Sequence, residues 1–103
     1  MANSIQIINQ LFEMQYKIKD IGEAVNFERN FIRLFSIFHE EGFIIQDPTN
    51  ETYTESRTDC EASISGKTSS KMRIVKTLKP VIYQKKDNNI QLIQKAVVIA
   101  ENK

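Results

Sequence analysis

Residues 26–45 read NFERNFIRLFSIFHEEGFII, and this stretch decides the fold. Its large apolar side chains recur every three or four residues, which predicts an amphipathic helix over 23–41. Gly42 follows at the place where a residue in the left-handed conformation commonly ends a helix. The recurring apolar positions are Phe27, Phe31, Leu34 and Phe38.

The apolar stripe of this helix is wider than a single neighbouring helix can cover. Ile32, Phe35 and Ile37 extend it beyond the arc of roughly 100° that one partner needs. Either the second half of the chain folds over this stripe, or a second copy of the chain does. Two helical hairpins that meet on a two-fold axis form a four-helix bundle. We favour this homodimer and keep a monomeric core as the alternative.

A shorter apolar pattern predicts another helix over 4–20, with Ser4 as its N-cap and Gly22 as its stop. Its apolar positions are Ile5, Ile8, Leu11, Phe12, Met14 and Ile18. The predicted dimer interface joins both helices and consists of Ile8, Phe12, Phe27, Phe31, Leu34, Phe35 and Phe38.

The second half of the chain predicts short strands and turns. Asp47-Pro48 begins a turn, and 49–60 is a polar stretch that we interpret as an irregular surface loop. The fold class is therefore α+β, with a helical hairpin over 1–42 and a small, mostly antiparallel β domain over 43–103. The expected strands begin at 43–45 and continue at 61–65, 71–78, 81–83 and 90–100, with 66–70 and 85–89 as breaks.

Composition limits the class of protein. The chain has 103 residues, enough for one small domain, and a formal net charge of +1, which excludes a strongly basic nucleic-acid wrapper. No apolar run approaches the roughly 20 residues of a membrane span, and the N-terminus has no secretory signal pattern. We expect a cytoplasmic protein that binds neither membrane nor nucleic acid.

Catalytic chemistry is sparse in this sequence. His39 has no identifiable partner for acid–base work, and the carboxylates that flank Cys60 disfavour a thiolate. One histidine and one cysteine do not form a structural zinc site. The seven basic residues of 67–86 form either a solvated face or a binding face for an acidic partner. We therefore expect no enzyme, no metal, no cofactor and no small-molecule substrate.

The stretch 26–45 resembles the second short helix of the GrpE family of nucleotide exchange factors. In that family a glutamate precedes an apolar helix, which ends at a Gly-Val pair followed by a β-prone pair. Glu28 matches the glutamate, and Gly42-Phe43 stands where the family has Gly-Val. The apolar register is matched by Phe31, Leu34, Phe35, Ile37 and Phe38.

Further motifs follow in the order of the family. Residues 47–53, DPTNETY, resemble Asp-Pro-x-Gly-Glu-x-Phe, and residues 60–62, CEA, stand where the family has His-Glu-Ala. Residues 94–99, QKAVVI, stand where it has Arg-Pro-Ala-x-Val-x-Val. The chain departs from the pattern at Cys60, at Gln94-Lys95 and in the polar residues of the first helix. It resembles a short form without the long N-terminal helix of the family.

The resemblance implies a homodimer whose β domains bind the nucleotide-binding domain of a DnaK-type chaperone and promote ADP release. The contacts we expect on that domain are Tyr53, Glu61, Lys79, Pro80, Gln94 and Lys95. One alternative is a degenerate GrpE-like dimeric interaction module without exchange activity. Another is a winged-helix DNA-binding protein, although the helix over 23–41 lacks the polar face of a recognition helix.

Overall fold

The computed structural model describes residues 2–67 and 71–102, which form two helices followed by two β-sheets. This arrangement is the α+β class that the sequence predicts. The expected break over 66–70 lies partly outside the described residues, at 68–70. The elements are α1 (Ala2–Asp20), α2 (Ala24–Glu40), β1 (Phe43–Gln46), β2 (Thr52–Tyr53), β3 (Cys60–Ser65), β4 (Met72–Lys79), β5 (Val81–Lys86), β6 (Asn89–Gln94) and β7 (Ala96–Asn102).

Both helices end at the glycines that the sequence indicates. Gly22 and Gly42 have φ angles of +79° and +95°, and each donates its backbone N–H to a carbonyl of the preceding helical turn. The start of α1 differs from the prediction. Ser4 was expected to be the N-cap, but the helix already includes Ala2, so Ser4 lies inside its first turn.

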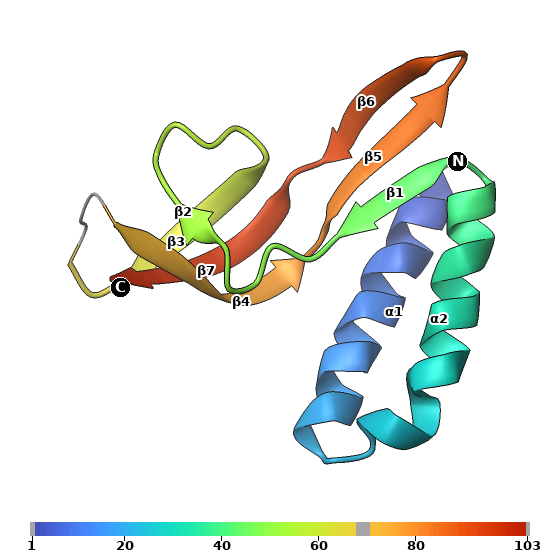
Figure 1. Ribbon diagram of the computed structural model, residues 1–103, viewed down its shortest axis with the longest axis horizontal. Helices are drawn as coiled ribbons and strands as arrows, with labels where there is room; N and C mark the ends of the chain where they lie inside the picture. The colour runs from blue at the N-terminus through green and yellow to red at the C-terminus, as the bar shows by residue number, and fades with distance from the viewer. Residues whose placement is uncertain (1, 68–70, 103) are drawn as a thin grey trace.

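The strands form two sheets (Figure 1). Sheet A has the order β1-β5-β6 and is antiparallel throughout. Sheet B has the order β2-β4-β7-β3, in which β7 pairs antiparallel with β4 and parallel with β3. Pro80 separates β4 from β5, at the start of a strand, where a residue without an N–H is tolerated.

The strand predicted over 90–100 is wrong as a single element. Lys95 divides it into β6, an edge strand of sheet A, and β7, a central strand of sheet B. The apolar run from Ala96 onward does occupy a central strand, as its composition suggests. The exposed pattern of β6 shows that the two parts have different surroundings.

Residues 49–60 were predicted to be an irregular loop, and this is also partly wrong. Thr52 and Tyr53 form β2, which pairs with β4. Arg57 orders the rest of residues 49–60 through side-chain hydrogen bonds. Its guanidinium donates to Asp59 at 2.7 Å, to the Thr52 carbonyl at 2.9 Å and to Glu51 at 2.6 Å. The segment is therefore an ordered arm of sheet B.

Two apolar clusters form the core. The first joins both helices to sheet A through Ile8, Phe38, Phe43 and Ile82. The second lies between the strands of sheet B and the start of β5 and consists of Cys60, Ile74, Val81, Ala96 and Val98. The boundary predicted at 42/43 falls at the turn between α2 and β1, and the first cluster crosses it.

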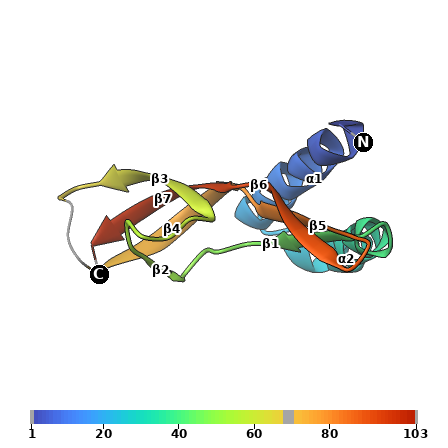
Figure 2. The same ribbon diagram turned by 90° about the horizontal axis from the view of Figure 1, so that it is seen from above.

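The molecule is flat, with extents of 39 × 38 × 18 Å. Figures 1 and 2 show the two helices beside sheet A, while sheet B projects away from them. In both views no helix among the described elements lies over either face of sheet B. The fold therefore has a helix-supported end and an open sheet.

Candidate protein-interaction surfaces

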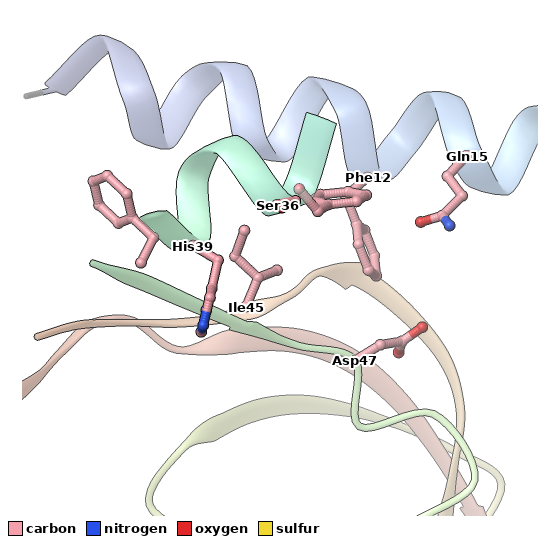
Figure 3. Close-up of a pocket in the computed structure, with 8 residues that line it drawn as sticks. Phe12, Gln15, Ser36, His39, Ile45 and Asp47 are labelled. Carbon is pink, nitrogen blue, oxygen red and sulfur yellow. The ribbon is translucent and has the colours of Figure 1, made fainter. Parts of the chain in front are cut away.

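A groove of about 530 Å³ lies between the helices and β1. Its walls are mainly apolar, with Phe12 from α1 and Ile45 from β1, as Figure 3 shows. Gln15, Ser36, His39 and Asp47 add polar groups to its lining. The groove is shaped by the same apolar packing that seats the helices on sheet A.

His39 and Asp47 do not form a catalytic pair in this groove. Figure 3 shows them apart, with Ile45 between them. The Asp47 carboxylate is occupied elsewhere: it accepts hydrogen bonds from the Thr49 hydroxyl at 2.6 Å and from Tyr16 at 3.1 Å. General acid–base work needs a donor and an acceptor that converge on one reacting atom. The groove does not supply that arrangement.

Tyr16 instead connects the helices to sheet B. Its hydroxyl lies 2.8 Å from the Thr49 hydroxyl, which lies 2.8 Å from the hydroxyl of Thr77 on β4. Partial burial raises the pKa of the Tyr16 phenol above its ordinary value, so the phenol stays protonated and can donate. The turn at Asp47-Pro48 is thus fastened to both α1 and β4.

The single cysteine is an inert core residue. Cys60 is buried in the second cluster, and burial raises the pKa of its thiol to about 11, with a further contribution from Asp59. The sequence correctly predicts the direction of this shift, although burial contributes more than the neighbouring carboxylate. A thiol with a raised pKa is a poor nucleophile at neutral pH.

Three of the six predicted chaperone contacts are exposed on or beside sheet B. Glu61 lies on β3 and Lys79 at the end of β4, and both are registered opposite Val97 of β7. Residues in register on adjacent strands share one face of a sheet. Glu61 and Lys79 therefore lie on the same face. Lys95 is exposed between β6 and β7.

The other three predicted contacts belong to the interior. Pro80 is fully buried, and Tyr53 packs against the second cluster. Gln94 exchanges two hydrogen bonds with Asn9 of α1, at 2.9 and 2.8 Å, and donates to the Pro80 carbonyl at 2.9 Å. Tyr53 and Gln94 are partly buried, and all three side chains contribute to contacts within the fold.

The predicted dimer-interface residues divide in a similar way. Ile8, Phe12, Phe31 and Phe38 are buried within the single chain, so they are covered without a second copy. Phe35 is partly buried against the first cluster. Phe27 and Leu34 are exposed, at 44% and 37% of their surface. Other exposed apolar side chains of the helices are Ile7, Met14, Val25, Ile32 and Ile37.

Sequence reasoning missed the apolar part of the sheet B face. The unbroken apolar run 96–100 predicts a strand that is either covered on both faces or central in its sheet. In the structure Ala96, Val98 and Ala100 are buried, while Val97 and Ile99 are only partly covered. The signal that could have found this face is the alternation of size along β7, where the larger side chains face outward.

Within the described ranges, no group of three or more His, Cys, Asp or Glu side chains is arranged to hold a metal ion. None of the described helices has the length and apolarity needed to cross a bilayer. Comparisons of the chain with protein-family models, with curated proteins and with solved structures find no match.

Proposed function

We propose that the chain is a GrpE-like nucleotide exchange factor, which binds the nucleotide-binding domain of a DnaK-type chaperone and promotes ADP release. The observation that carries this proposal is the division of the molecule into a helix-supported end and an open sheet B (Figures 1 and 2). A sheet that projects from a rigid base is suited to insertion against another protein. The absence of a converging catalytic group in the described groove agrees with a binding function.

The residues that resemble GrpE motifs also support this proposal by their positions in the fold. Gly42-Phe43 forms the junction of α2 and β1, and Asp47-Pro48 forms the turn that is fastened to α1 and β4. Glu61 presents its side chain on sheet B. The resembling residues therefore lie at the joints of the fold and on its projecting part, and not in scattered surface positions.

The proposed mechanism is a population shift. The factor binds the open state of the nucleotide-binding domain better than the closed, ADP-loaded state, and so favours release. Linkage requires that ADP weaken binding of the factor by the same ratio by which the factor weakens binding of ADP. The energy comes from binding alone, so the chain itself needs no reacting group.

We further propose that two copies of the chain associate through their helices as a four-helix bundle. The supporting observation is a stripe of exposed apolar side chains on α2, at Phe27, Leu34 and Ile37, of which Ile37 is 52% exposed. Ile7 and Met14 form a second exposed apolar pair on α1. Apolar side chains clustered on one helix face commonly mark an interface.

Release of a fluorescent ADP analogue from a DnaK-type chaperone tests the exchange function. We expect the release rate to rise with chain concentration and to saturate. Light scattering on the same sample reports whether the chain is a dimer. A folded dimer that leaves the release rate unchanged would overturn the exchange function.

One alternative has a specific observation in its favour, namely a dimeric interaction module without exchange activity. The chain departs from the family pattern at Cys60 and Gln94, and both side chains are used inside the fold. Under this alternative the chain only dimerises or binds another protein, and any binding to the chaperone is independent of ADP. Measuring the affinity of the chain for the chaperone with and without ADP distinguishes the two functions.

A further inference from the structure

One face of sheet B carries a line of positive charge beside an apolar strip. Arg73, Lys76 and Lys79 of β4 are registered opposite Glu101, Ile99 and Val97 of β7. Irregularities at Val75 and Leu78 keep the three cations on one face although they are three residues apart. We call this surface the cationic face; it consists of Arg73, Lys76, Lys79, Val97, Ile99, Glu61, Ser63 and Glu101.

The opposite face of the same strands is closed. Ile74 and Thr77 of β4 pair with Ala100 and Val98 of β7, and all four are buried. The cationic face has the reverse character, because its three cations are exposed and Ile99 is only partly covered. The alternation of buried and partly covered positions over residues 96–100 of β7 shows that one side of the sheet is core and the other is surface.

The three cations of this face share it with two carboxylates, Glu61 and Glu101. Among the ion pairs of the described residues, none involves Arg73, Lys76 or Lys79. Glu101 lies opposite Arg73 in register but forms no described ion pair with it. The opposite edge of the face, on β3, carries Glu61 and Ser63. The positive charge of this face is therefore concentrated along β4, next to β2 at the outer side of the sheet.

This combination fits an acidic protein surface better than a nucleic acid. Val97 and Ile99 offer an apolar strip that can bury side chains of a protein partner, next to cations that can pair with carboxylates. The face has no aromatic residue on which a base could stack, and Glu61 and Glu101 would repel phosphates. The chemistry selects a partner with carboxylates that flank an apolar patch.

We propose that the cationic face is the surface by which the chain binds an acidic region of the chaperone's nucleotide-binding domain, an inference that rests on the proposed function. It extends the predicted contacts from Lys79 and Glu61 to Arg73, Lys76, Val97 and Ile99. It also removes Tyr53, Pro80 and Gln94 from the contact surface, because they pack inside the fold. Positive charge along β4 raises the rate of association with the partner, and burial of the apolar strip lowers the rate of dissociation.

The test compares two triple variants that change net charge equally. Arg73→Glu/Lys76→Glu/Lys79→Glu reverses the cationic face. Lys19→Glu/Lys85→Glu/Lys86→Glu reverses three exposed cations on α1 and β5, far from that face in the fold. Binding to a DnaK-type chaperone is measured by calorimetry at two salt concentrations, together with release of the ADP analogue. Circular dichroism confirms that both variants are folded.

We expect the face variant to bind roughly tenfold or more weakly, and the control variant to bind within about twofold of wild type. Wild-type affinity should fall with added salt, and the face variant should lose most of that dependence. If the face variant does not fold, Lys76→Ala/Lys79→Ala is compared with Lys85→Ala/Lys86→Ala in the same way.

The outcomes separate the two proposals. If wild type stimulates ADP release and the face variant does so equally well, the cationic face is not the contact surface, while the exchange function stands. If wild type neither binds the chaperone nor changes ADP release, the proposed function fails and this inference fails with it. Binding of wild type to single-stranded RNA is measured under the same conditions. If wild type binds this RNA more tightly than it binds the chaperone, the face is a nucleic-acid surface and the proposal is overturned.

Discussion

Sheets A and B are built from strands that alternate between them along the chain, yet the two sheets have different surroundings. Sheet A packs one face on the helices through Phe43 and Ile82, and so shares its core with them. Sheet B has a core of its own, and the described structure places no helix over it (Figure 2). Under the proposed function, stability and recognition are divided between two sheets of one small domain. The hydroxyl contacts from Tyr16 of α1 through Thr49 to Thr77 of β4 connect the open sheet to the helices.

The largest expected contrast between the sheets comes from two isoleucine truncations. Ile82→Ala removes a fully buried side chain between sheet A and the helices and should cost about 2–5 kcal/mol of unfolding free energy. Ile99→Ala shortens a partly exposed side chain on sheet B and should cost well under half as much, because the site is open to water. Urea unfolding measures both. Equal costs would mean that the cationic face is covered in solution.

Alanine substitutions at the two helix-ending glycines test how tightly α2 is joined to sheet A. Gly42→Ala places a Cβ at 2.8 Å from the Lys85 carbonyl oxygen at a φ of +95°, so both contact and conformation are unfavourable. We expect a loss of roughly 2–4 kcal/mol. Gly22→Ala meets no atom within 4 Å at a φ of +79° and should cost only about 1 kcal/mol, from conformation alone. Thermal unfolding of the two variants would contradict this explanation if their losses were the same.

Loss of the side-chain hydrogen bonds between Asn9 of α1 and Gln94 of β6 should have a smaller effect on the free energy of unfolding. Gln94→Ala removes three hydrogen bonds and leaves Asn9 and the Pro80 carbonyl without this partner. The expected loss is about 1–3 kcal/mol. The exposed Gln91→Ala on the same strand is the matched control, since a surface change away from such features stays within about 0.5 kcal/mol. Chaperone affinity should be unaffected in both variants if Gln94 is structural and not a contact.

The smallest expected effect is a pH dependence in the arm of sheet B. The Arg57 guanidinium holds the pKa of the Asp59 carboxyl below its usual value. The folded pKa is therefore lower than the unfolded one, so the ion pair stabilises the fold above about pH 4 and is lost as pH falls through the folded value. The stability difference between wild type and Asp59→Asn should shrink below that pH. A difference that stays constant down to pH 2 would show that the pair adds no stability.

The helices could be predicted from the sequence because their signals are local. Spacing of three and four residues places Phe31 and Phe38 on one face, and Gly22 and Gly42 end the helices as expected. The division of residues 90–100 could not be predicted. Lys95 is no breaker by itself, and the change from edge strand to central strand depends on pairing with β3, about 35 residues earlier.

The candidate surface could be predicted only in part, because local signals reveal exposure but not which strands pair. Charge reveals that Lys79 and Glu61 are exposed, but only strand register shows that they share a face with Val97. The interior role of Gln94 depends on Asn9, a residue 85 positions away, and no local pattern reports such a contact. Likewise, burial of Phe12 and Phe31 inside one chain, and not between two, follows from how the chain packs on itself.

The most direct test of the central claim is methyl NMR of isoleucine side chains during addition of a DnaK-type chaperone. Ile99 reports on the cationic face, Ile90 on the exposed edge of sheet A and Ile32 on the exposed side of α2. We predict that the Ile99 methyl signal broadens or shifts first, while the methyl signals of Ile90 and Ile32 remain unchanged. Perturbation of Ile90 or Ile32 with an unchanged Ile99 would contradict it, because the partner would then bind the supporting part of the molecule.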